Sequence, residues 1–105
     1  MVTIKWSKKA RRLFREHISY ARTEFGEETA LRWYRQINII EDRLRKHPES
    51  YTQESLIVKS HIYRSAIIMK RFKIVHFYIP GSNTVRIVDI WDMRMNPENL
   101  RQRIK

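Results

Sequence analysis

The sequence predicts an α+β fold in which a helical hairpin packs on one face of a small, mostly antiparallel sheet, in the order β-α-α-β-β-β. Apolar residues recur at three- and four-residue intervals through the first half of the chain, which is typical of amphipathic helices. β-Branched and aromatic residues dominate the second half, which indicates strands. The two glycines and three prolines all fall between these stretches. A length of 105 residues predicts one domain, spanning residues 1–105.

The first two elements are a short strand and a helix. Residues 2–6 alternate apolar and polar side chains, so we expect a half-buried strand at an edge of the sheet. Ser7 supplies an N-cap for a helix over residues 8–25, and Gly26 fits the end of that helix. The apolar face of this helix is formed by Ala10, Leu13, Phe14, Ile18, Ala21 and Phe25.

A second helix follows after a very short link. Glu27 and Glu28 suit its first turn, and His47-Pro48 ends it. Because the link is short, the two helices should form an antiparallel hairpin. The apolar stripe of the second helix is formed by Ala30, Trp33, Tyr34, Ile37, Ile40 and Leu44. The polar residues 48–54 then predict a loop.

Three strands are predicted over residues 62–69, 72–79 and 84–92. The last two are joined by Pro80-Gly81-Ser82-Asn83, which has hairpin-turn chemistry. Nearly every position in these strands is apolar, so both faces of the sheet should be partly covered. Two helices can cover only one face. The other face should therefore form a shallow second core or a surface that a partner occupies.

The composition points to a polyanionic partner. The chain has 22 Lys and Arg against 11 Asp and Glu, a net charge of +11, which favours nucleic acid or an acidic protein. Membrane binding is disfavoured because the apolar face of the first helix is needed for the core. The absence of cysteine excludes disulfides and a cysteine nucleophile. No apolar run approaches the roughly 20 residues of a membrane span, so we expect a cytoplasmic protein.

Positive charge is concentrated in two places. No acidic residue lies between Glu54 and Asp89, which makes the predicted sheet a candidate platform for a nucleic acid. The residues that we expect to bind nucleic acid there are Lys59, Lys70, Arg71, Arg86 and Tyr63. The second group lies at the start of the first helix, where cations oppose the helix dipole and are expected to face a partner. It comprises Lys5, Lys8, Lys9, Arg11, Arg12 and Arg15.

The sequence offers few candidates for catalysis. Its four histidines have no metal-binding spacing, so neither a metal nor another cofactor is expected. His76 lies in an apolar strand, where a packed ring is more common than a base, and is a weak catalytic candidate. Asp92 and Arg94 lie two residues apart on one side of the last strand and are expected to pair.

The order and spacing of several short motifs resemble the RelE/ParE family of toxins from bacterial type II toxin–antitoxin and plasmid-stabilisation systems. The resemblance covers nearly the whole chain and implies the fold derived above. The motifs that carry it are Ala30-x-x-Trp33-x-x-x-Ile37, Leu44-x-x-x-Pro48, Tyr63-Arg64, Phe72-Lys73-Ile74-Val75 and Val88-Asp89-Ile90-Trp91-Asp92-Met93-Arg94-Met95-Asn96-Pro97.

The resemblance implies one of two activities. One branch of the family cuts messenger RNA in the ribosome with a cluster of basic residues and a C-terminal tyrosine, whereas the ParE branch inhibits DNA gyrase and lacks that cluster. Arg64, Lys73 and Arg94 align with basic positions of the nuclease branch. A further basic position falls on Ala66, and the tyrosine position falls near Leu100. The general base is therefore missing, and His61, His76 or Asp92 would have to replace it.

Because three basic positions of the nuclease branch are matched, RNA cleavage is favoured slightly over gyrase inhibition. The leading prediction is a toxin that acts as a ribosome-dependent, metal-independent messenger RNA endonuclease, arrests growth and is neutralised by an acidic antitoxin. The first alternative is a gyrase inhibitor without nuclease activity. The second is a non-catalytic nucleic-acid-binding module, which the charge alone would support.

Overall fold

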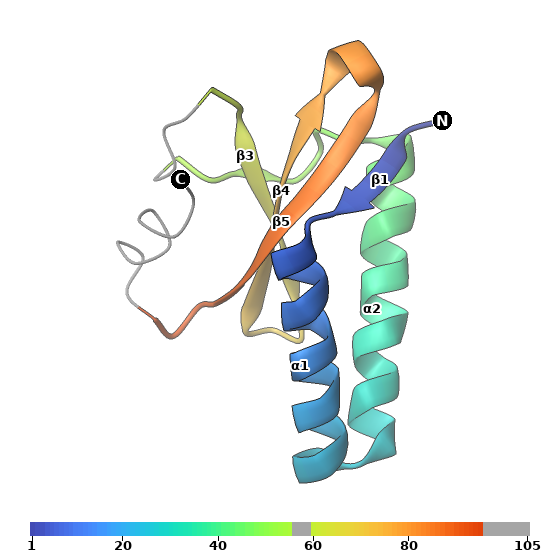
Figure 1. Ribbon diagram of the computed structural model, residues 1–105, viewed down its shortest axis with the longest axis vertical. Helices are drawn as coiled ribbons and strands as arrows, with labels where there is room; N and C mark the ends of the chain where they lie inside the picture. The colour runs from blue at the N-terminus through green and yellow to red at the C-terminus, as the bar shows by residue number, and fades with distance from the viewer. Residues whose placement is uncertain (56–59, 96–105) are drawn as a thin grey trace.

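The computed structural model has two helices packed on a five-stranded mixed sheet, which confirms the predicted fold class (Figure 1). It describes residues 1–55 and 60–95. Neither helix in these ranges is long and apolar enough to cross a membrane. The elements are β1 (Thr3–Trp6), α1 (Lys8–Phe25), α2 (Glu27–Lys46), β2 (Thr52–Gln53), β3 (Tyr63–Ile68), β4 (Phe72–Ile79), the 3-10 turn η1 (Pro80–Ser82) and β5 (Thr84–Asp92).

The strand order is β1-β5-β4-β3-β2, so β1 lies at one edge as expected. It pairs in parallel with β5, and the other neighbours pair antiparallel. The prediction of a loop over residues 48–54 was wrong in one respect. Thr52 and Gln53 form the opposite edge strand β2, paired with Ser65 and Arg64 of β3. Two exposed residues carry no apolar periodicity, so only their pairing with β3 defines this strand.

Local signals set the bounds of the helices. The Ser7 side chain accepts a hydrogen bond from the backbone N–H of Ala10 at 3.0 Å, which caps α1 as predicted. Gly26 has φ of +94°, a conformation that a side chain would disfavour, and it separates α1 from α2. Glu27 and Glu28 lie in the first turn of α2, where the helix dipole favours negative charge.

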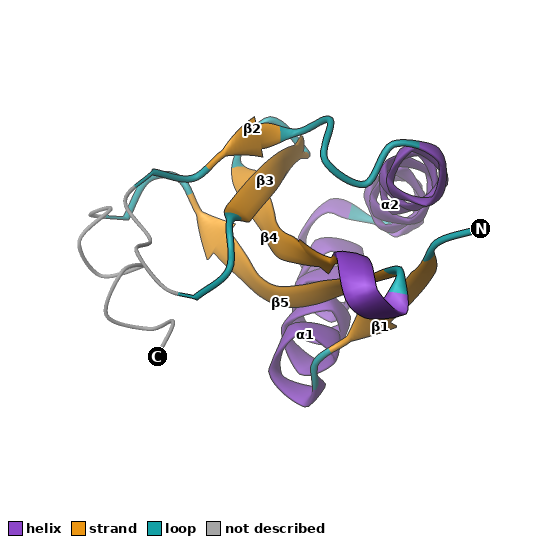
Figure 2. Cartoon of the chain, turned by 90° about the horizontal axis from the view of Figure 1, so that it is seen from above, coloured by secondary structure: helices purple, strands orange, loops and turns teal. Residues whose placement is uncertain are grey.

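Both helices lie on the same side of the sheet and enclose the main core (Figure 2). Ile87 and Ile90 of β5 both contribute to this core although they are three residues apart. A β-bulge allows this: the partner of Val75 is Asp89 but the partner of His76 is Ile87, so Val88 is an extra residue. Other fully buried core residues are Ala10, Ala30, Leu44, Ile68, Ile74 and Val85.

The opposite face of the sheet carries a second, smaller core. It consists of Tyr63, Val75, Phe77 and Trp91, with Ile79 and Val88 packed against them. This arrangement confirms that both faces of the sheet are partly covered. It also explains why the strands are apolar at nearly every position, since alternate side chains belong to different cores.

Two residues of the predicted helical stripes are exposed. Phe25 is 66% exposed because it is the last residue of α1, at the end of the hairpin that extends past the sheet (Figure 1). Tyr34 is 43% exposed. Successive residues of a helix point about 100° apart around its axis. Because Trp33 points into the core, the next residue, Tyr34, points partly toward solvent.

Candidate functional site

Two of the three cations that match nuclease positions lie on opposite faces of the sheet. Arg64 pairs in register with His76, and Lys73 pairs with Ile67. Because side chains alternate along a strand, Arg64 is on the face that carries the helices and Lys73 on the face that carries the second core. The two cations therefore do not converge on one point in this structure.

Arg64 is held near the start of β2. Its Nη1 donates a hydrogen bond to the carbonyl oxygen of Tyr51 at 2.9 Å, and its Nη2 lies 4.0 Å from Glu49 Oε2. The side chain is only 19% exposed. These contacts fix the loop that leads into β2, and they use donors that a substrate phosphate would need.

Lys73 is held by a carboxylate that the sequence did not single out. Its Nζ lies 2.8 Å from Glu54 Oε2, and the same oxygen accepts a hydrogen bond from Ser65 Oγ at 2.9 Å. The Glu54 side chain is 11% exposed and that of Lys73 is 26% exposed. Glu54 is 19 residues from Lys73 in the sequence, so only strand pairing brings them together.

Arg94 forms the predicted pair with Asp92. Arg94 Nη2 donates to Asp92 Oδ2 at 2.9 Å and Nε lies 3.2 Å from Oδ1, while the Arg94 backbone N–H also donates to Oδ1 at 2.9 Å. The Arg94 side chain is 64% exposed, so the remaining donors of its guanidinium are accessible to a partner. Chiefly through the side-chain hydrogen bond from Arg94, the pKa of Asp92 falls from 3.8 to about 2.

We expect Arg94→Met to raise the pKa of Asp92 back toward 3.8, because the side-chain hydrogen bonds and the positive charge are both lost. Arg94→Lys is the matched control, since it keeps the charge but removes the planar fork, and it should give an intermediate value. In the wild type, this pair contributes stability above about pH 4, and the contribution is lost as the pH falls toward about 2. Carboxyl chemical shifts followed during an acid titration measure all three values. An unchanged Asp92 midpoint in Arg94→Met would contradict this account.

His76 is fully buried and faces the main core side of the sheet. Its Nδ1 lies 2.9 Å from the carbonyl oxygen of Ile74, and its Nε2 has no hydrogen-bond partner among the described residues. Burial lowers the pKa of His76 to about 4, so the ring is neutral at physiological pH. A ring with no exposed surface cannot touch a phosphodiester in this conformation.

The residues predicted to bind nucleic acid are spread over the sheet. Lys70 and Arg71 are exposed at the β3–β4 turn, and Arg86 is half-buried beside its register partner Phe77. Tyr63 is 8% exposed, and its ring packs edge-on against Phe77 with centroids 5.2 Å apart. Its ring is thus used in the second core rather than offered to a base. Lys59 lies outside the described residues.

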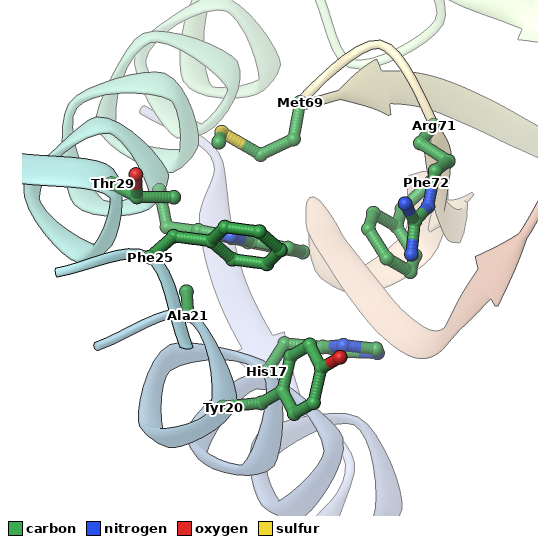
Figure 3. Close-up of a pocket in the computed structure, with 9 residues that line it drawn as sticks. His17, Tyr20, Ala21, Phe25, Thr29, Met69, Arg71 and Phe72 are labelled. Carbon is green, nitrogen blue, oxygen red and sulfur yellow. The ribbon is translucent and has the colours of Figure 1, made fainter. Parts of the chain in front are cut away.

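An aromatic pocket lies between the helical hairpin and the β3–β4 turn (Figure 3). It has a volume of about 130 Å³, with Arg71 among its lining residues. The His17 ring stacks on Trp33 with centroids 5.3 Å apart and contacts Phe72 at 4.5 Å. Burial lowers the pKa of His17, which favours its neutral form. These rings suit apolar contact more than proton transfer.

The described residues hold no group of three or more His, Asp or Glu side chains that could bind a metal ion. Each of the three cations that match nuclease positions is paired with a carboxylate. Within residues 1–55 and 60–95, these cations can bind anions at separate points, but they do not gather a nucleophile, a base and a phosphate site.

Comparison with known proteins identifies a family by sequence and a solved structure with a similar fold. The family model described as the ParE toxin of the type II toxin–antitoxin system, parDE, matches residues 4–97. A solved chain from the chromosomal ParDE toxin–antitoxin system of P. aeruginosa has the same fold, with a TM-score of 0.67. It is 18% identical and covers 88% of this chain and 96% of its own. No curated protein matches the sequence.

Proposed function

The chain belongs to the ParE toxin family of type II parDE toxin–antitoxin systems, and we propose that it arrests growth by inhibiting DNA gyrase without cutting RNA. This reverses the order of preference drawn from the three matched cations. Family membership makes the chain a toxin, so a stand-alone nucleic-acid-binding module is no longer a candidate. Gyrase inhibition is the activity that the resemblance implies for the ParE branch.

The separation of the cations carries this proposal. Stabilising the charge that develops during phosphodiester cleavage requires donors fixed around one phosphate. Arg64 and Lys73 are on opposite faces of the sheet, and each is bound to an acidic side chain. Freeing Lys73 for a substrate would break an ion pair that is largely shielded from water. Freeing Arg64 would break its hydrogen bond to the carbonyl oxygen of Tyr51. The absence of a basic residue at Ala66 agrees with a site that is not built for cleavage.

The partner of the toxin is an antitoxin, since a parDE system implies one. We propose that this antitoxin is acidic. The toxin has a net charge of +11, and an acidic segment would neutralise it on binding. A lysine-rich or neutral cognate antitoxin would contradict this part of the proposal.

We expect Arg64→Met and Lys73→Met to arrest growth as the wild type does. A gyrase inhibitor needs neither cation for RNA chemistry, and methionine keeps the long apolar stem of each side chain. Colony counts after induction in bacteria, with soluble protein confirmed, provide the measurement. Each variant should still fold, because methionine keeps the packing of the side-chain stem. Lys73→Met should melt at a lower temperature than the wild type, because it leaves the Glu54 carboxylate with only the Ser65 hydroxyl as a partner.

Transcript ends mapped after the same induction distinguish the alternatives. The gyrase proposal predicts no new ends inside translated messages with the wild type or either variant. New ends that disappear in Arg64→Met or Lys73→Met, together with loss of growth arrest, would overturn the proposal in favour of the nuclease. A melting curve of each purified variant separates this outcome from simple unfolding.

A further inference from the structure

The first two turns of α1 carry a stripe of four cations, formed by Lys8, Arg11, Arg12 and Arg15. Their spacing of three and four residues puts them on neighbouring positions of the helix surface, and all four are exposed. The first turn contains no acidic residue. Cations at a helix N-terminus oppose the helix dipole, so this stripe does not stabilise the helix that bears it.

The stripe lines a hollow together with Trp6. The hollow has a volume of about 460 Å³, and Trp6 is the uncharged residue among the described residues that line it. The indole N–H of Trp6 donates to Glu41 Oε2 at 3.3 Å, and the ring packs edge-on against Phe14 with centroids 5.3 Å apart. The ring that forms one side of the hollow is therefore held in place by α1 and α2 before any ligand binds.

Few of these cations are neutralised. Arg12 Nε lies 3.8 Å from Glu16 Oε1, but both side chains are 61% exposed, and such a pair contributes little. Among the described residues, no carboxylate forms an ion pair with Lys8, Arg11 or Arg15. The neighbouring Lys9 behaves differently: its Nζ lies 3.4 Å from the buried Asp89, so it is not part of the stripe.

We propose that this α1 stripe binds the sugar–phosphate backbone of duplex DNA. Arg15 lies seven positions after Lys8, which places the two about 10 Å apart along the helix axis. One DNA strand carries a charge about every 3.4 Å along the duplex axis, so the stripe runs beside about three phosphates. Ammonium and guanidinium groups recognise phosphates without reading bases, and binding is therefore independent of DNA sequence.

An acidic protein segment is the competing occupant. Such a segment would need apolar contacts, and an adjoining hollow that shares Arg11 and Arg15 with the stripe supplies them from Phe14, Tyr34 and Ile37. The same hollow is also lined by Glu41, whose carboxylate would repel an acidic segment placed there. The hollow beside the stripe is lined by four cations and one indole. This lining suits the densely charged sugar–phosphate backbone of DNA better than it suits a peptide. This proposal goes beyond the proposed function: it concerns the toxin and DNA alone and holds whether or not gyrase is the target.

Anisotropy of a short labelled DNA duplex, titrated with the intact protein at rising salt, tests the proposal. Neutralising about three phosphates predicts that the wild-type association constant falls about 40-fold between about 50 and 200 mM salt. In Arg11→Gln/Arg15→Gln the two remaining cations can neutralise about two phosphates, and the fall should be only about 12-fold. Arginine and glutamine have similar helix propensities, and neither Arg11 nor Arg15 forms an ion pair with another described residue, so this variant should melt no lower than the wild type.

The matched control is Arg32→Gln/Arg35→Gln, which removes the same charge from exposed positions of α2. It should keep the wild-type salt dependence. If the control reduces binding and salt dependence as much as the stripe variant does, binding follows net charge and the proposal is wrong. It is also wrong if an acidic amphipathic peptide of equal charge binds through Arg11 and Arg15 while the duplex does not.

Discussion

Leu44→Ala should lower the free energy of unfolding by about 2–5 kcal/mol, because it leaves a cavity between α2 and the sheet. Leu44 is fully buried, and it belongs to the main core that holds the helical hairpin against the strands. Small domains have a total stability of about 5–15 kcal/mol, so this loss removes a large share. Denaturant unfolding of the purified variant measures it.

Leu31→Ala is the matched control for this prediction. It is the same chemical change on the same helix, but Leu31 is 42% exposed. We expect its effect to stay within about 1 kcal/mol, since little buried apolar area is lost. Equal effects of the two substitutions would show that the core is not where the structure places it.

The helices and most strands could be predicted because their signals are local. Ser7 and Gly26 mark the two ends of α1 in the sequence itself, and both lie where predicted. The three C-terminal strands also agree with the sequence to within a residue at each end. Alternating burial on two faces accounts for their continuous apolar pattern, which the sequence already indicated.

The features that escaped prediction depend on strand pairing. β2 consists of two exposed residues that only β3 holds in place. The bulge at Val88 is defined by the shift in pairing between β4 and β5, and no turn or glycine marks it in the sequence. The contact of Lys73 with Glu54 joins residues 19 apart. A resemblance could align Arg64 and Lys73 with catalytic positions, but it could not show that they occupy opposite faces.

The candidate site was predicted only where it depends on residues close together in the sequence. The pairing of Asp92 with Arg94 follows from the two-residue period of a strand, and the structure contains it. The burial of Tyr63 and His76 depends on which face each side chain occupies and on what packs there. Strand parity alone does not determine that packing, so both residues remained candidates in the sequence and are enclosed in the fold.

The most direct test of gyrase inhibition is a supercoiling assay with purified gyrase, relaxed plasmid, ATP and this protein. Inhibition that deepens with toxin concentration is the expected result, and adding the cognate antitoxin beforehand should restore supercoiling. Arg64→Met and Lys73→Met should inhibit as the wild type does. The control Leu31→Ala should also inhibit, because its fold is retained. The account is contradicted if folded wild-type protein leaves supercoiling unchanged while it cuts messenger RNA on translating ribosomes.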